Sequence, residues 1–271
     1  MDFGARSDVG RVRENNEDSF GLAPELNLFV LSDGMGGLES GERASRLAVE
    51  TAITHCRDSA ANTSLPVFGG KIEGVSETSS RLASAVRLAN QEIYQAAQEL
   101  GGKGSMGATI VAAWCLADRI CLAHVGDSRA YLLRKGQFDQ LTEDHSFVAE
   151  QVRRGILTPE QASRSKMQNV LTRALGVEQH VDVDVTEELL VEDDICLLCS
   201  DGLFRELSEA QIAGVLGEST GAQESADRLV ELANQAGGGD NITAIVLRHL
   251  PKQAGALSKL GRWFKGAEDP S

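Results

Sequence analysis

The chain lacks any apolar run long enough to cross a bilayer, which takes about 18 to 20 residues in a helix. Its first ten residues, MDFGARSDVG, also lack the basic and then apolar order of a secretory signal peptide. We therefore expect a cytoplasmic protein. The composition, 42% apolar and 24% charged over 271 residues, is typical of a globular protein and argues against a disordered chain.

Basic residues are scarce beside acidic ones. Lys and Arg number 26 against 40 Asp and Glu, so the formal net charge is −14. Such a charge repels polyphosphate backbones and disfavours nucleic acid as a partner. The acidity itself has two interpretations, a diffuse solvating surface or, in part, a concentrated cation site.

Cysteine and histidine are few and lack the spacings of metal sites. The five cysteines are an odd number in a chain without a signal peptide, which argues against a disulfide framework. Cys196 and Cys199 form a C-x-x-C inside the apolar run ICLLC, where we expect buried small hydrophobes because no second pair exists. The five histidines form no H-x-x-H or H-E-x-x-H pattern, so a zinc hydrolase is poorly supported.

Hydrophobic patterning predicts strands in blocks and helices in pairs, which indicates the α+β class. Strands are expected at 26–32, 108–116, 120–125, 130–134, 195–199 and 241–247. Helices are expected at 41–56, 82–100, 143–164, 207–216 and 222–236. The three strands between 108 and 134 are too closely spaced for crossover helices, so we expect antiparallel neighbours, with a hairpin turn at Asp127.

Four aspartates stand at the ends of expected strands. Asp33 and Asp201 each follow an apolar strand in a Ser-Asp-Gly sequence, Asp127 ends a third strand, and Asp240 precedes a fourth. Taken singly, each is a common turn residue. Together they would lie at one rim of a sheet, where clustered carboxylates repel one another unless a cation is bound. Mg²⁺ and Mn²⁺ suit such oxygen ligands, and two such ions can activate a shared water for displacement at phosphorus.

The N-terminal stretch VRENNEDSF supplies two further kinds of group. Glu17 and Asp18 add carboxylates, and Arg13 can hold two phosphate oxygens in a bidentate contact.

Six motifs in order, RENNED, SDGMGG, GATIVAA, VGDSRAY, CSDGLF and GGGDNITAIV, closely resemble the bacterial metal-dependent Ser/Thr protein phosphatases of the type 2C (PPM) family. The resemblance covers residues 1–249 and leaves 250–271 as a C-terminal tail. It implies a four-layer αββα sandwich of two antiparallel sheets flanked by helices. It also implies hydrolysis of phosphoserine and phosphothreonine by in-line attack of a metal-bridging hydroxide.

The resemblance further implies a role for each motif residue. Asp33 bridges two Mn²⁺ or Mg²⁺ ions, the Gly34 carbonyl binds one, and Asp201 and Asp240 complete the pair. Asp127, with Asp201, holds a weaker third ion. The N-terminal residues act around this centre: Asp18 through metal-bound water, Glu17 as its neighbour, and Arg13 on the substrate phosphate. The expected partners are phosphorylated proteins and a cognate Hanks-type Ser/Thr kinase, and the protein is expected to be a monomer.

Three features depart from the family pattern. Leu38 and Glu39 stand where a His often follows DGMGG, and Ser165 and Lys166 stand where the flap region usually carries His-Pro. The tail, 250–271, has a short basic amphipathic pattern, typical either of a frayed terminus or of docking to a partner or an anionic membrane.

Three alternatives remain open at this point. Residues 199–205, CSDGLFR, satisfy the C-x₅-R of cysteine phosphatases, although an aspartate would lie in the phosphate cradle. GDSRA around Ser128 approaches the serine-hydrolase G-x-S-x-G elbow, but a strand follows it in place of a helix. The third alternative is a non-catalytic protein that binds phosphoproteins. The complete set of acidic residues argues against it.

Overall fold

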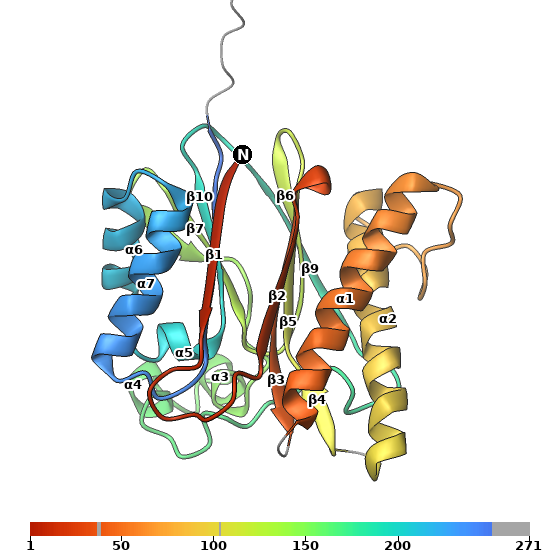
Figure 1. The fold of residues 1–271 in the computed structure, drawn as a ribbon, viewed down its shortest axis with the longest axis horizontal. Helices are drawn as coiled ribbons and strands as arrows, with labels where there is room; N and C mark the ends of the chain where they lie inside the picture. The colour runs from red at the N-terminus through yellow and green to blue at the C-terminus, as the bar shows by residue number, and fades with distance from the viewer. Residues whose placement is uncertain (37–38, 103, 251–271) are drawn as a thin grey trace, which may run out of the picture.

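The computed structural model of the chain describes residues 1–36, 39–102 and 104–250. Two antiparallel sheets lie face to face between two outer layers of helices (Figure 1), which confirms the predicted αββα sandwich. The first sheet runs in the order β1 (Asp2–Asp8), β11 (Ile242–Arg248), β10 (Ile195–Cys199), β7 (Arg129–Arg134) and β8 (Gln137–Gln140). The second runs β2 (Asp18–Ala23), β3 (Leu28–Gly36), β5 (Ile110–Cys115), β6 (Arg119–Val125) and β9 (Asp184–Leu189), with β4 (Met106–Ala108) paired to β3.

The helices form two outer layers and one end of the sandwich (Figure 1). The second sheet is covered by α1 (Ser40–Ala61) and α2 (Glu77–Leu100), and the first by α6 (Glu209–Glu218) and α7 (Ala222–Ala236). Shorter helices α3 (Phe147–Arg153), α4 (Pro159–Ala162) and α5 (Asp201–Phe204) lie at the lower end in this view, and a 3₁₀ turn spans Pro24–Leu26. Within these ranges no helix is both long and apolar enough to cross a membrane.

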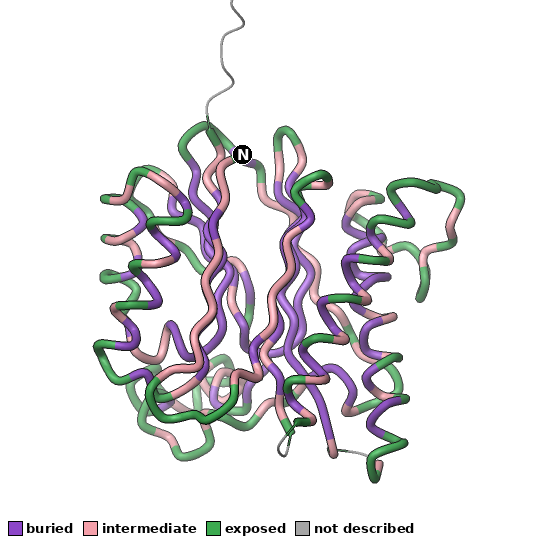
Figure 2. Tube along the Cα trace, in the orientation of Figure 1, coloured by how far each residue is buried: buried purple, intermediate pink, exposed green. Residues whose placement is uncertain are grey.

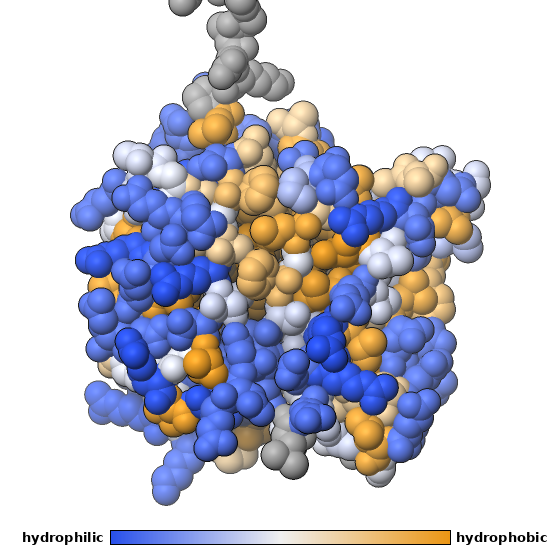
Figure 3. Space-filling view, viewed as in Figure 1, coloured by the Kyte–Doolittle hydropathy of each residue, from blue (hydrophilic) through white to orange (hydrophobic). Residues whose placement is uncertain are grey.

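Three apolar cores separate the four layers. One lies between α1, α2 and the second sheet, one between the two sheets, and one between the first sheet and α6 and α7. Strands β5 and β10 are therefore buried at every residue, because each has a covered layer on both faces (Figure 2). The face seen in Figure 3 is hydrophobic in its upper middle and hydrophilic at the sides and below. On that face β1 and β2 form the edges of their sheets (Figure 1).

The two long helices follow from local sequence signals. The Ser76 side chain caps α2 by accepting from the backbone N–H of Ser79, and Gly101, with a φ of 131°, ends the helix. In α1, Ala44, Ala48 and Ala52 recur every four residues and are fully buried. These small side chains form one face of α1, which allows close packing on the sheet.

The turn at Asp127 is not the expected hairpin. Strands β5 and β6 are antiparallel neighbours as predicted, but β6 and β7 belong to different sheets. Gly126 has a φ of 107°, and a Cβ there would lie 2.6 Å from the Thr109 Cβ, so glycine is needed for the chain to cross between the sheets. The crossing places Asp127 between the two sheets.

Other elements also differ from the prediction. The helix expected at 143–164 is two short helices, because Gly155 has a φ of 69° and Pro159 opens a new helix capped by Thr158. Five strands were not predicted as separate elements: β1, β2, β4, β8 and β9. Leu38 and residues 251–271 lie outside the described residues, so the predictions made for them are not addressed by the structure.

Candidate metal centre

The strand ends bring the predicted acidic residues to one end of the sandwich. Asp18 and Asp33 are direct partners in the pairing of β2 with β3, while Asp201 follows β10 and Asp240 precedes its neighbour β11. A cleft of about 220 Å³ opens here, and we call it the acidic cleft. Its lining includes seven of the eight predicted site residues: Arg13, Glu17, Asp33, Gly34, Asp127, Asp201 and Asp240.

Asp18 is the exception, because it does not line the acidic cleft. Its Oδ2 accepts hydrogen bonds from Ser200 Oγ at 2.7 Å and Thr243 Oγ1 at 2.6 Å. Its Oδ1 has no hydrogen-bond partner among the described residues. Burial raises the pKa of Asp18 to about 7, although both hydroxyl groups act to lower it.

The carboxylates of the cleft destabilise one another's charged forms. Burial, and then repulsion by Asp18 and Asp201, raises the pKa of Asp33 well above its ordinary value. Burial, and then Asp201, raises the pKa of Asp127 to about 7, and burial raises that of Asp201. Arg205 offsets part of this charge, at 2.7 Å from Asp201 Oδ2 and 3.7 Å from Asp127 Oδ2.

A divalent cation fits this donor set. Among the described residues, no side chain or backbone group forms a hydrogen bond with Asp201 Oδ1 or Asp18 Oδ1, although both oxygens are buried. Hard carboxylate oxygens are the ligands that Mg²⁺ and Mn²⁺ prefer. A bound cation would remove the repulsion that raises these pKa values.

Close backbone packing fixes Asp33 and Gly34. The Asp33 N–H donates to Thr109 Oγ1 at 3.0 Å, and the Thr109 N–H donates back to the Asp33 carbonyl at 2.8 Å. The Gly34 N–H donates to the Glu17 carbonyl at 3.0 Å, and a Cβ on Gly34 would lie 2.0 Å from the Gly41 carbonyl oxygen. Any residue larger than glycine would therefore push β3 away from the start of α1.

Asn241 holds the N-terminal loop over the cleft. Its Oδ1 accepts from the Glu17 N–H at 2.8 Å, and its Nδ2 donates to the carbonyls of Val9 and Asn15. Arg13, carried by this loop, donates to Asp240 Oδ2 at 2.8 Å, and its side chain is 48% exposed. The guanidinium thus stands at the rim of the cleft, accessible to a ligand.

Five residues that support the acids were not predicted from the sequence. These are Thr109, Ser200, Arg205, Asn241 and Thr243. One signal was available for Ser200: Ser-Asp-Gly occurs twice, and in both copies the serine hydroxyl donates a hydrogen bond inside the centre, Ser32 to the Thr109 carbonyl and Ser200 to Asp18. In the flap region, Asn169 lines the cleft and Ser165 and Lys166 do not.

The two rival nucleophiles are poorly placed. Cys199 is fully buried, and burial raises the pKa of its thiol, so it is not a thiolate at neutral pH. Arg205 is paired with Asp201 and makes no phosphate cradle with Cys199. Ser128 is 1% exposed, and its hydroxyl bonds to Thr109 Oγ1 at 2.7 Å, with no base in that contact.

A second cluster that could ligate a metal lies outside the cleft. Ligand atoms of His124, His145 and Asp184 lie within 4.8 Å of one another. The guanidinium of Arg173 already forms an ion pair with Asp184 there, so the positive charge that a metal would supply comes from a side chain of the protein. We do not assign this cluster as the metal centre.

Comparison with known proteins identifies the family of the chain. The family model of protein phosphatase 2C matches residues 10–236. The serine/threonine phosphatase stp of Listeria innocua is 35% identical over 253 residues, covering 92% of this chain and 96% of that protein. The serine/threonine protein phosphatase PstP of Mycobacterium tuberculosis is 37% identical over 244 residues, covering 90% of this chain and 44% of that protein.

Solved structures agree as well. The catalytic domain of PstP in complex with two manganese ions superposes with a TM-score of 0.78 at 36% identity, covering 92% of this chain and 98% of that one. The chain therefore belongs to the protein phosphatase 2C family. It is a protein serine/threonine phosphatase of that family.

Proposed function

We propose that the acidic cleft binds two Mn²⁺ or Mg²⁺ ions and hydrolyses phosphoserine and phosphothreonine in proteins. Asp33, Gly34, Asp201 and Asp240 would hold the pair, and Asp127 with Asp201 a weaker third ion. The observation that carries the proposal is the convergence of buried carboxylates whose charge the surrounding residues offset only in part. Such a site is stable in its ionised form only with cations bound.

When bound, the ions supply a lowered pKa for a shared water and stabilise charge during in-line displacement at phosphorus. The protein residues bind and orient. Arg13 leaves its exposed contact with Asp240 and makes a bidentate contact with the phosphate. Asp18, held by two hydroxyl groups, would orient water through Oδ1, which has no hydrogen-bond partner among the described residues. Glu17, which lines the cleft, lies in the same water layer.

The test is hydrolysis of p-nitrophenyl phosphate and of a phosphothreonine peptide, with and without Mn²⁺. Wild-type protein should hydrolyse both only with the ion present, Asp33→Asn and Asp240→Asn should be inactive, and Cys199→Ser should keep its activity. Full activity of the Asp33→Asn protein with Mn²⁺ supplied would overturn the proposal. A wild-type protein that binds phosphopeptides but never hydrolyses them would be a non-catalytic binder.

We also propose that residues 1–249 contain the whole catalytic unit, acting as a cytoplasmic monomer that opposes a Hanks-type kinase. Family analogy supports the kinase, and the pairing of β1 with β11 supports the boundary, since it ends at Arg248. A chain truncated after residue 250 should keep wild-type hydrolysis of p-nitrophenyl phosphate. If truncation lowered that activity, the tail would be part of the catalytic unit.

A further inference from the structure

Residues 147–170, which we call the flap, leave and re-enter the fold at a closed base. The Phe147 N–H donates to the Val170 carbonyl at 2.7 Å, and the Thr172 N–H donates to the His145 carbonyl at 2.8 Å. The flap reaches the acidic cleft through Asn169, and Leu171 just beyond it also lines the cleft. His145 is thus the residue at which the flap joins the sandwich.

His145 also grips the turn that carries Asp127. Its backbone N–H donates to the Gly126 carbonyl at 3.0 Å, and its ring Nδ1 faces the Gly126 N–H, also at 3.0 Å. Gly126 also packs against Thr109, whose hydroxyl accepts the Asp33 N–H. The residue before Asp127 is therefore in contact both with the segment that supports Asp33 and with the base of the flap.

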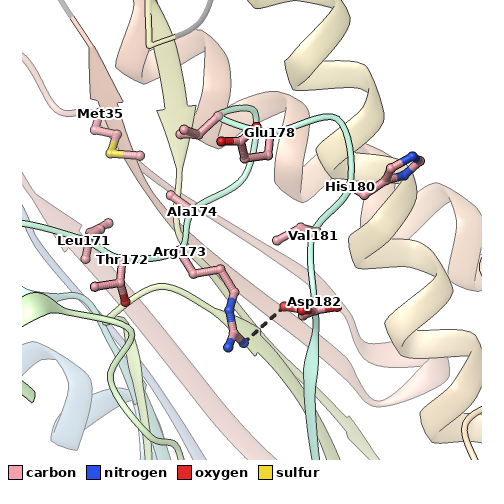
Figure 4. A pocket seen from close by; sticks show the side chains of 10 residues that line it. Met35, Leu171, Thr172, Arg173, Ala174, Glu178, His180, Val181 and Asp182 are labelled. Carbon is pink, nitrogen blue, oxygen red and sulfur yellow. Dashed lines mark hydrogen bonds between the residues drawn. The ribbon is translucent and has the colours of Figure 1, made fainter. Parts of the chain in front are cut away.

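The chemistry of the ring fixes its orientation. His145 Nε2 lies 3.1 Å from both Asp184 Oδ2 and Arg173 Nη1. Because Nδ1 accepts the Gly126 N–H, a neutral imidazole carries its proton on Nε2, so Nε2 donates to Asp184 and its contact with Arg173 is not a hydrogen bond. Arg173 bonds the other oxygen of Asp184 and the Asp182 carbonyl, and Figure 4 shows its side chain extended toward Asp182, away from Met35. Met35 and Leu171 line both the acidic cleft and the neighbouring cavity of about 390 Å³ drawn there.

Burial and the stacked ring of His124, 4.7 Å away, keep His145 neutral. Together with weaker effects they lower the pKa of His145 to about 4, although Asp184 acts to raise it. At neutral pH the ring therefore keeps Nδ1 free to accept from Gly126.

We propose that His145 is a positioning residue that fixes the Asp127 turn to the base of the flap and so aims Asp127 into the acidic cleft. The inference rests on the proposed function, because Asp127 is there assigned to the weaker third ion. This positioning role differs from general packing, because it depends on a hydrogen bond to one nitrogen of the His145 ring. That nitrogen is Nδ1, which faces Gly126, and Nε2 serves only to orient the ring.

Two substitutions separate the nitrogens. In His145→Asn the amide oxygen lies near the position of Nδ1 and can accept from Gly126, while in His145→Gln the amide nitrogen lies near Nε2 and can donate to Asp184 but the acceptor is lost. The first readout is hydrogen exchange of the Gly126 amide by NMR in metal-free protein. The second is the number and affinity of Mn²⁺ ions bound, from the signal of free Mn²⁺ in electron paramagnetic resonance.

We expect His145→Gln to speed exchange at Gly126 and to weaken the third ion about 10- to 100-fold, the range seen when a group that orients a ligand is removed. His145→Asn should retain slow exchange and nearly wild-type binding of that ion. His124→Gln is the control for the stacked neighbour: His124 is equally buried, and its side-chain hydrogen bond goes to the Glu143 carbonyl and leaves the Nδ1 contact of His145 in place, so third-ion binding should fall far less than in His145→Gln.

Equal loss of third-ion binding in the Asn and Gln variants, tracking their melting temperatures, would overturn the proposal in favour of a structural histidine. Slow Gly126 exchange in His145→Gln would also overturn it. If Asp127→Asn still bound three ions, the assignment of Asp127 would fail, and with it the proposed role of His145 in aiming Asp127 into the cleft. A wild-type protein that bound no Mn²⁺ would instead contradict the proposed function, and Gly126 exchange would then report only on the hydrogen bond.

Discussion

Strand β10 has a buried aspartate just outside each of its ends, and the two are satisfied very differently. Asp194, 1% exposed, accepts from Arg134 at both oxygens, at 3.0 and 2.8 Å, and from the Val191 N–H at 2.8 Å. Asp201, 8% exposed, accepts from Arg205 at Oδ2 and has an orphaned Oδ1. Burial alone therefore does not mark a functional carboxylate. A functional carboxylate is distinguished by negative charge that the surrounding residues do not fully compensate.

The most severe test of this difference is Asp201→Asn. Removing a ligand for the proposed ions should lower kcat/KM for p-nitrophenyl phosphate at saturating Mn²⁺ by at least about 100-fold, comparable to losing one electrostatic stabiliser of a transition state. Asp194→Asn, at the other end of the strand, should keep wild-type activity per folded molecule. Similar losses in both variants would show that the activity assay reports only folding.

For the free energy of unfolding the order should be reversed, with the larger loss in Asp194→Asn. Asp194→Asn leaves Arg134 without its bidentate partner and should lower the free energy of unfolding by about 2–3 kcal/mol. Asp201→Asn should cost metal-free protein less, because it also relieves repulsion within the acidic cleft. Urea unfolding in the presence of a chelator measures both. A greater loss in Asp201→Asn would show that Asp201 is as fully compensated as Asp194.

The stability of the metal-free protein should depend on pH through the carboxylates whose charge is not compensated. Asp18 and Asp127 have pKa values raised to about 7 in the folded protein against 3.8 ordinarily, so between pH 4 and 7 the folded state binds more protons than the unfolded one. Stability should then fall as pH rises through this window, by about 1 kcal/mol per pH unit for each proton retained. Saturating Mn²⁺ should flatten the slope. Melting curves at several pH values, with chelator or Mn²⁺, check this, and a metal-free stability that rises from pH 4 to 7 would contradict it.

The smallest expected effect concerns the support of Asp18. Thr243→Val removes a hydroxyl that donates to Asp18 Oδ2 and should weaken Mn²⁺ binding about tenfold. The matched control is Thr186→Val in β9, on the far edge of the other sheet, where binding should be unaffected. Calorimetric titration with Mn²⁺ measures both variants. Unchanged affinity in Thr243→Val would remove Thr243 from the centre.

The sequence predicted that these acidic residues meet at one rim, because their signal is local. Asp33 and Asp201 each follow an apolar run in the same three-residue pattern, and strand ends in a sheet share a rim. Thr243 and Asn241 carry no such signal. Their roles come from the pairing of β10 with β11 and from contacts with residues more than 200 positions away.

The failed predictions have physical causes as well. Spacing alone cannot tell whether a short turn returns to its own sheet or crosses to the other, and at Asp127 contacts of Gly126 with Thr109 and His145 decide it. The apolar periodicity of 143–164 continues past Gly155, whose conformation ends the helix. Strands β1 and β2 are half-buried edges of their sheets, so their apolar pattern is weak.

The pairing of β1 with β11 also sets the order in which the protein can become active. Asp2 pairs with Arg248, and the acidic cleft takes residues from Arg13 through to Asp240. Contacts between such distant residues form late in folding, since they close the longest loops. During synthesis the chain presents Arg13 and Asp33 long before Asp201 and Asp240 exist. A growing chain on the ribosome therefore cannot act on any phosphoprotein around it, and activity begins only when the last strand is in place.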